Sequence, residues 1–346
     1  MLSQIYSRNF ERVIFFSEGE ARGIIAIHST TLGPALGGCR FREYQSEEAA
    51  LNDVLLLAEG MTYKASLAEL NLGGGKAVLF KSGKISDRKK LFETFGEIVG
   101  SLNGMYITAE DLGTTAADMD VVASKTIYVR GTSKFGDPSP YTALGVVEGI
   151  KACLNFLFGS EDLTGRKILI QGVGAVGQEL VKILAATEAN LIISDVDESK
   201  TNLLRQQFSN IQVCDPSKIY DIEGDIFCPS AVGQVINKDT AQRLKVKAIA
   251  GAANNQLDDP STLTILSQRK IIYVPDFVVN AGGLIKVAHE NANDQKSMID
   301  KIKAIKSRVT KILKLSQDTG ATTLEIALDL AKQRLEQAKN LKQSKN

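Results

Sequence analysis

A glycine-rich segment, residues 172–177, restricts the fold of this chain of 346 residues more than any other feature. Gly172, Gly174 and Gly177 have the spacing GxGxxG. The apolar residues 167–171 before them predict a strand, and the residues that follow predict a helix. In that setting, bare glycines let the backbone approach a pyrophosphate at the helix N-terminus. The segment therefore predicts a βαβ unit of a Rossmann-type parallel sheet that binds a dinucleotide.

An acidic residue follows this segment at the spacing that a dinucleotide site requires. Asp195 comes after the second predicted strand, residues 191–194, about 20 residues beyond the glycines. Its carboxylate would accept hydrogen bonds from the adenosine ribose and repel a 2′-phosphate, which favours NAD over NADP. Asp197 is an alternative for this role, and Ala175 and Val176 belong to the same expected cofactor site. The alternative is a tight turn in which the glycines serve only packing. It would not explain why a strand, a helix and an acidic residue all stand at the spacing of a dinucleotide site.

The length and the element pattern predict an α/β protein of two domains with a cleft between them. Residues 131–140 are rich in Gly, Asp, Ser and Pro, and their two X-Pro steps favour an extended linker. We expect a substrate-binding and catalytic domain over residues 1–138 and a doubly wound NAD-binding domain over residues 139–319. A C-terminal helix, residues 320–346, should pack back on the first domain.

The first half alternates strands and helices. The expected strands are residues 13–16, 23–28, 76–80 and a strand ending near Asp111, and the expected helices are a helix capped by Ser46 and residues 87–102. Residues 33–38, with three glycines and a proline, predict a loop.

Composition excludes several classes of function. The 41 basic residues nearly cancel the 40 acidic ones, so neither nucleic acid nor a membrane surface is an expected partner. Four scattered cysteines without CxxC spacing argue against a disulfide framework and a zinc site, and we expect no metal.

The N-terminus mixes charges and no run of about 18 apolar residues occurs, which favours a cytoplasmic protein. Only His28 and His289 are present, which disfavours oxidation of a hydroxy acid by a histidine base.

Two lysines are candidates for the chemistry. Residues 72–77 resemble a phosphate-binding loop, but Ala77 stands where Ser or Thr is needed. Lys76 follows three residues without side chains, so it could approach a ligand closely and lose water, which favours the neutral amine that acts as a base. Lys64 lies 12 residues earlier, near the end of a helix expected to pack beside that strand. One lysine could bind a carboxylate while the other moves protons. A single lysine is more often a solvated surface charge, so the pair must carry the interpretation.

Several long motifs, in one order along nearly the whole chain, resemble the glutamate/leucine/phenylalanine/valine dehydrogenase family, and the details are most similar to leucine dehydrogenase. These motifs are residues 33–40, 60–65, 71–77, 108–115, 138–143, 172–177, 251–257 and 275–283. The resemblance implies a symmetric homo-oligomer.

The resemblance also implies roles for individual residues. Lys64 would hold the substrate carboxylate, Lys76 would activate the water that attacks the imino intermediate, and Asp111 would move protons at the amine. Asn280 would orient the substrate and Asn254 would lie near the nicotinamide. The remaining expected substrate-binding residues are Gly37, Gly38, Leu36, Ala109, Leu284 and Val287, of which the last four would form an apolar pocket that rejects glutamate. Taken without its neighbours, Asp111 would read as a helix cap before Thr114 or a surface acid.

The implied function is the reversible, NAD-dependent oxidative deamination of a small apolar L-amino acid of the leucine, valine or isoleucine type to a 2-oxo acid and ammonium. Lys286 departs from the leucine pattern, in which asparagine is usual beside the pocket, and Glu69, Tyr141 and Ser230 depart as well. A phenylalanine- or tryptophan-type dehydrogenase is therefore one alternative, because one methylene changes selectivity by only about 1–3 kcal/mol. A non-catalytic sensor of NAD or an amino acid on the same fold is another.

Overall fold

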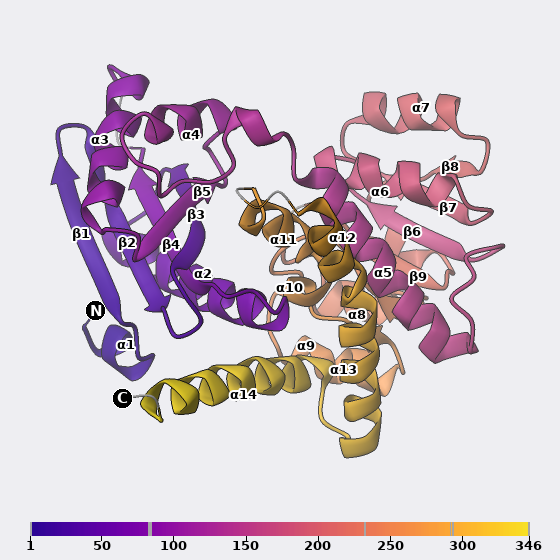
Figure 1. Ribbon diagram of the computed structural model, residues 1–346. Coiled ribbons are helices and arrows are strands. Elements are labelled where there is room, and N and C mark those ends of the chain that lie inside the picture. The colour runs from indigo at the N-terminus through magenta and orange to yellow at the C-terminus, as the bar shows by residue number, and fades with distance from the viewer. Residues whose placement is uncertain (1, 82–84, 232, 291, 293, 345–346) are drawn as a thin grey trace. The chain divides into compact units, whose positions relative to one another are not determined.

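The computed structural model describes residues 2–81, 85–231, 233–290, 292 and 294–344, and the chain divides into two compact units (Figure 1). Unit 1 comprises Met1–Asp137 and Leu330–Asn346, and unit 2 comprises Pro138–Asp329. The first change of unit lies within the expected linker. The second lies inside the C-terminal helix, later than the position near 320 that we expected.

Unit 1 contains a mixed sheet of five strands in the order β1-β2-β4-β3-β5. The strands are β1 (Arg12–Glu18), β2 (Ala21–Ser29), β3 (Ala35–Arg42), β4 (Gly73–Phe80) and β5 (Tyr106–Glu110). Strand β2 is antiparallel to β1 and β4, whereas β3 is parallel to β4 and β5. The last residues of the parallel strands β3, β4 and β5 therefore lie at the same edge of the sheet.

Helices cover both faces of this sheet (Figure 1). They are α1 (Leu2–Ser7), α2 (Glu47–Leu67), α3 (Arg88–Ser101) and α4 (Ala116–Ala123), with a 3-10 turn at Ser133–Phe135. On one face the apolar side of α2 packs on Ile24, Ala26 and Val78. On the other face α3 and α4 pack around Phe95 and Tyr106. Because side chains alternate along a strand, the even-numbered residues of β3 and β4 share the α2 face with Val78.

Strand β3 corrects the sequence interpretation, which predicted a loop over residues 33–38. Residues 35–42 form a strand between β4 and β5, buried over most of its length. Glycine is unusual within a strand, but here it allows two backbones to meet: a Cβ on Gly37 would lie 1.7 Å from the carbonyl oxygen of Gly75. For the same reason β4 begins at Gly73 and not at Lys76, where the predicted strand began.

Unit 2 contains a parallel sheet of six strands in the order β11-β10-β9-β6-β7-β8. The strands are β6 (Lys167–Gln171), β7 (Asn190–Ser194), β8 (Ile211–Val213), β9 (Ile226–Pro229), β10 (Ala248–Ile249) and β11 (Ile272–Tyr273). The chain runs outward from β6 in one direction and then returns to β9 on the other side of it. This is the doubly wound Rossmann order, and its switch point between β6 and β9 is where such folds bind ligands.

The helices of unit 2 connect and cover these strands. They are α5 (Ser139–Phe158), α6 (Ala175–Ala185), α7 (Glu198–Gln207), a 3-10 turn at Ile219–Asp221, α8 (Lys238–Arg243), α9 (Thr262–Gln268), α10 (Asp276–Val279), α11 (Gly282–Ala288), α12 (Gln295–Lys303), α13 (Ile305–Thr319) and the first residues of α14 (Thr323–Gln343). Among the described helices, α5 alone has the length and composition of a membrane span, which the sequence interpretation did not expect. It packs against α6, α11 and α13, as a core helix of a globular unit does.

Candidate active site

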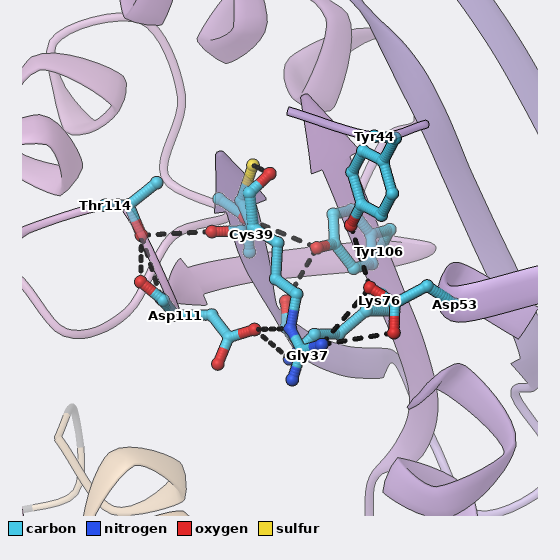
Figure 2. Close-up of polar contacts among 10 residues, drawn as sticks. Gly37, Cys39, Tyr44, Asp53, Lys76, Tyr106, Asp111 and Thr114 are labelled. Atoms are coloured by element: carbon cyan, nitrogen blue, oxygen red, sulfur yellow. Dashed lines mark hydrogen bonds and ion pairs between the residues drawn. The ribbon is translucent and has the colours of Figure 1, made fainter. Parts of the chain in front are cut away.

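A buried lysine and an aspartate form an ion pair at the edge of the unit 1 sheet (Figure 2). Lys76 lies in β4 and is only 5% exposed, and Asp111 directly follows β5. The Lys76 Nζ is 2.9 Å from Asp111 Oδ2. The structure thus brings together Lys76 and Asp111, the two residues expected to move protons. In this arrangement Lys76 is paired as an ammonium, so it must lose a proton before it can act as a base.

The charges around Asp111 determine its ionisation. Burial alone would raise the pKa of this carboxyl, but the Lys76 ammonium and the Arg40 guanidinium outweigh burial and lower the pKa to about 2. Asp111 is therefore an anion throughout the neutral range.

Three residues that sequence reasoning gave no role extend this pair into a network. Arg40 Nε donates to Asp111 Oδ2 over 2.6 Å, and Arg40 Nη1 donates to both oxygens of Asp53 over 3.1 and 3.2 Å. Tyr44 Oη donates to Asp53 Oδ2 over 2.8 Å. Asp53 lies in the sequence between Leu51 and Val54, two buried residues of α2. An acidic residue so close to the buried face of a helix was the one sequence feature that could have indicated a buried ionic partner. Arg40 was part of a recognised motif, but its partner in α2 is 13 residues away in the sequence.

Glycines set the geometry around the network by excluding side chains. A Cβ on Gly38 would lie 2.4 Å from the Glu110 carbonyl oxygen and 2.8 Å from the Asp111 Cβ, so only glycine leaves room for the aspartate. A Cβ on Gly74 would lie 2.1 Å from the Thr62 backbone nitrogen, so α2 rests directly on β4. Lys64 follows Thr62 by two residues on α2 and is half-buried. Gly37 accepts a hydrogen bond from Tyr106 Oη at its carbonyl oxygen, over 2.6 Å.

Asp111 is neither a surface acid nor a helix cap, the two alternatives that its sequence position allowed. It is no surface acid, since its side chain is 23% exposed and bonded to two cations. Helix α4 is capped by Thr115, whose side chain accepts from the Asp118 backbone N–H in a capping box. Thr114 Oγ1 instead accepts a hydrogen bond from the Asp111 backbone N–H, which fixes the start of the turn.

Leu36 and Ala109 lie on the neighbouring strands β3 and β5, on the face that α2 covers. In register, Leu36 pairs with Ile107 and Gly38 pairs with Ala109. Leu36 is 2% exposed and Ala109 is 8% exposed, so both belong to the buried lining of this part of unit 1.

In unit 2 the glycine segment has the shape that a dinucleotide requires. Gly172 has φ +90°, a conformation that disfavours other residues, and a Cβ on Gly177 would lie 2.1 Å from the Gly172 carbonyl oxygen. Gly174 precedes α6 as its N-cap, and a Cβ there would meet nothing within 4 Å. Ala175 and Val176 begin α6, whose free N–H groups and dipole favour an anion. The loop fits a pyrophosphate in space and in polarity.

The acid after β7 holds this loop. Asp195 Oδ2 accepts from the Val173 backbone N–H over 2.7 Å, and Oδ1 accepts from the Asp197 backbone N–H over 2.9 Å. These bonds fix a carboxylate beside the loop, where it can accept hydrogen bonds from the hydroxyls of an adenosine ribose. Asp197 has another duty, because its side chain caps α7 and pairs with Lys200.

The structure also brings Asn254 and Asn280 together. Asn280 Nδ2 donates to Asn254 Oδ1 over 2.7 Å and to the Ala252 carbonyl oxygen over 3.1 Å. Asn280 is only 3% exposed, and within the described chain its Oδ1 has no hydrogen-bond partner. A buried acceptor without a donor is rare in folded proteins and marks this position as a candidate functional site.

Helix α11 carries Leu284, which is 9% exposed, and the half-buried Val287. Between them, Lys286 pairs with Glu290 over 2.9 Å, with both side chains almost completely buried. We find no cluster of three or more His, Cys, Asp or Glu side chains suited to a metal ion in the described part of the chain.

Comparison with known proteins decides the family. Residues 16–128 match the Glu/Leu/Phe/Val dehydrogenase dimerisation domain, and residues 193–340 match the glutamate/leucine/phenylalanine/valine dehydrogenase domain. The chain belongs to this family. Leucine dehydrogenase of Bacillus subtilis is 42% identical over 335 residues, which cover 95% of this chain and 92% of that enzyme. Phenylalanine dehydrogenase of Caldalkalibacillus thermarum is 39% identical over 342 residues, 96% and 92% of the two chains.

A solved structure agrees over the full length. The crystal structure of L-tryptophan dehydrogenase from Nostoc punctiforme superposes with a TM-score of 0.88 at 38% identity, and covers 98% of this chain and 100% of that one. The dehydrogenase described here is thus an oxidoreductase acting on amino acids, with the two-domain α/β fold that the sequence predicted. These relatives act on three different substrates at similar identity, so identity alone does not choose among them.

Proposed function

We propose that this dehydrogenase catalyses the reversible, NAD-dependent oxidative deamination of a small apolar L-amino acid of the leucine, valine or isoleucine type to the 2-oxo acid and ammonium. The observation that carries the proposal is the buried Lys76–Asp111 pair beside a glycine-formed face of unit 1. A cation that can release a proton and a neighbouring fixed anion are the groups that deamination needs.

NAD, the cofactor of this family of dehydrogenases, would be held by the loop of Gly172, Gly174 and Gly177, with Asp195 at the ribose. When bound, it supplies the acceptor for the hydride that leaves the substrate Cα. Asp195 would repel the 2′-phosphate of NADP. Asn254 and Asn280 would lie at the nicotinamide and the substrate amine, where the unpartnered Asn280 Oδ1 can accept a hydrogen bond.

The residues of unit 1 would handle the substrate. Lys64 binds its carboxylate as an ammonium. Lys76, after its proton has been lost, takes a proton from the water that adds to the imino carbon. Asp111 accepts hydrogen bonds from the substrate amine and passes to it the proton that Lys76 has taken from the water, so that ammonia can leave. Gly37 and Gly38 keep side chains out of this space.

The substrate preference follows from the side chains proposed to contact the apolar end. Leu36, Ala109, Leu284 and Val287 carry no charge, which disfavours the glutamate side chain. Lys286 does not change this, because its ammonium is neutralised by Glu290. A phenylalanine- or tryptophan-type substrate remains the second candidate, since relatives with both names match along nearly the whole chain. A sensor is not favoured, because the named relatives are dehydrogenases.

We further propose a homo-oligomer and a cytoplasmic location. The first rests on the match of residues 16–128 to a dimerisation domain, and the second on the four cysteines, which form no disulfide with one another.

A substrate panel tests the proposal. Purified enzyme with NAD is given each of the twenty L-amino acids in turn, and NADH absorbance is followed. We expect the highest kcat/KM with leucine, valine or isoleucine, little activity with glutamate, and poorer activity with NADP. In reverse, NADH oxidation with the 2-oxo acid must require ammonium. Activity highest with phenylalanine or tryptophan would replace the proposed substrate, and no amino acid oxidation at all would overturn the proposed function.

A further inference from the structure

We propose that Arg40 is a positioning residue for this reaction: it clamps Asp111 by one carboxylate oxygen, aims the other toward the substrate amine, and offsets the negative charge of the two carboxylates near Lys76. The inference rests on the proposed function for its kinetic consequences and on the contacts of Arg40 for its geometry.

The clamp acts on a single oxygen. Arg40 Nε and Lys76 Nζ both lie on Asp111 Oδ2, at 2.6 and 2.9 Å. Within the described chain no hydrogen bond reaches Asp111 Oδ1, and Figure 2 shows that oxygen directed away from the dashed contacts. With Oδ2 fixed by two cations and the backbone N–H fixed by Thr114, the carboxylate cannot rotate without breaking these bonds. Oδ1 is therefore presented in one orientation.

A second carboxylate fixes the guanidinium itself. Asp53 accepts from Arg40 Nη1 with both oxygens, and Tyr44 holds Asp53 from the other side. Arg40 is 15% exposed, so little solvent competes for these bonds. Only a planar fork can span the two acids, because the single ammonium of a lysine is a point charge. The bridge joins β3, α2 and the residue after β5 into one rigid unit.

The second part of the proposed role concerns the balance of charge around Lys76. The charged and titratable groups bonded within this cluster are Lys76 from β4, Arg40 from β3, Asp53 from α2, Tyr44 from the segment before α2, and Asp111 after β5. The Cys39 thiol lies on the opposite face of β3, and burial raises its pKa well above the ordinary value, so it stays neutral. With Arg40 present, its positive charge offsets one of the two carboxylates. Without it, two carboxylates would lie near Lys76 with no second cation to offset them, and the pH dependence of the reaction would change.

The test compares Arg40→Met with Arg40→Lys. For Arg40→Met we expect the acidic limb of kcat/KM for the amino acid to move up by about one pH unit, as a lost neighbouring charge produces. We also expect kcat to fall by up to about 10²-fold, as for a catalytic group displaced by about 1 Å. Arg40→Lys keeps the positive charge but loses the planar guanidinium that spans the two acids. The acidic limb of its kcat/KM profile should therefore stay near that of the wild type, while kcat falls.

Arg88→Met is the matched control, because Arg88 makes a two-bond ion pair with Asp118 in the same unit but outside this network. It should lower the thermal midpoint and leave the pH profile unchanged. An Arg40→Met enzyme that resembles this control, or the wild type, would overturn the inference. If Arg40→Met does not fold, Arg40→Lys decides: a lowered kcat with an unmoved limb supports the inference, and a wild-type kcat overturns it.

A second readout separates this inference from the proposed function. Competitive labelling of lysines with acetic anhydride, read by mass spectrometry, gives the pH at which Lys76 becomes reactive in any folded variant. Arg40→Met, or Arg40→Gln in its place, should move that pH upward. A wild-type enzyme that oxidises no amino acid would defeat the proposed function, whereas an unmoved labelling profile would defeat the role of Arg40.

Discussion

At the scale of single residues, Lys64 and Lys76 carry the same charge but differ in surroundings. Lys76 is buried and ion-paired on a strand, whereas Lys64 is half-buried near the end of a helix. A group that binds substrate and transition state equally affects KM, and a group that moves a proton affects kcat. The two lysines should therefore respond differently to the same substitution.

We predict that Lys76→Ala lowers kcat by about 10²–10⁴-fold, the loss typical of a general base, and removes the acidic limb of kcat/KM. Lys64→Ala should chiefly raise the KM for the amino acid, with a smaller loss of kcat. Steady-state kinetics check both, with NAD binding by fluorescence titration as the control. Near-normal kcat in Lys76→Ala would refute the mechanism, and loss of NAD binding would indicate misfolding.

Asp111 gives a prediction on pH and stability. Its pKa is lowered to about 2, so it stabilises the folded state fully above the ordinary aspartate pKa near about 4, and this stabilisation is lost as the pH falls through about 2. Asp111→Asn should therefore cost about 2 kcal/mol at neutral pH and much less near pH 2. Urea unfolding at several pH values measures the difference. An equal cost at every pH would contradict the ionic origin of the stabilisation.

Sequence reasoning reached the pair but not the network, for a physical reason. Lys76, Asp111 and the glycines stand in contiguous motifs, whereas the bonds of Arg40 join segments 13 and 71 residues away in the chain. Such bonds depend on the pairing of β3 with β5 and on the position of α2 against the sheet. Neither can be predicted from the sequence before the order of the strands is known.

At the scale of elements, the packing of α2 on β4 depends on Gly74. A Cβ at this position would lie 2.1 Å from the Thr62 nitrogen, a backbone atom that cannot rotate away. Gly74→Ala should push α2 outward and cost about 1–3 kcal/mol, as overpacking does. Because α2 carries both Lys64 and Asp53, the KM for the amino acid should also rise.

Gly60 provides the matched control, because it lies in the same helix and a Cβ there would meet nothing within 4 Å. Gly60→Ala should stabilise α2 by about 0.5–1 kcal/mol, since alanine loses less conformational freedom in a helix. Denaturant unfolding of both variants measures this contrast. If Gly74→Ala were as stable as the wild type, the close contact between helix and strand would not limit the packing.

The element pattern shows where periodicity succeeds and where it fails. The helices and most strands follow the apolar repeat, because their buried faces are made of apolar side chains. Strand β3 was mistaken for a loop because its inner residues include Gly37 and Gly38, which bury backbone in place of side chains. Glycine usually favours turns, but here it lies within a strand because it allows two backbones to approach closely.

At the scale of the whole molecule, unit 1 is built from both ends of the chain. Ser66 Oγ donates to the Ala331 carbonyl oxygen over 2.8 Å. Arg334 Nη1 donates to the carbonyl oxygens of Ser66 and Leu70, each over 3.0 Å. These carbonyls lie at and just after the end of α2, where the last C=O groups of a helix accept bonds from groups outside the regular helical pattern. The C-terminal helix thus stabilises the element that carries Lys64.

We therefore predict that a chain ending at Asp329 keeps NAD binding, because unit 2 is complete, but loses oxidation of the amino acid and unfolds at lower temperature. Arg334→Met should show the same defects in weaker form, a fall in stability of about 1–3 kcal/mol for the loss of both hydrogen bonds from the guanidinium. Removal of residues 341–346 alone is the control and should change nothing, since the described residues of that tail are exposed. Calorimetry, NAD titration and NADH absorbance give the three readouts. Full amino acid oxidation by the chain ending at Asp329 would mean that α2 holds its site without the C-terminal helix.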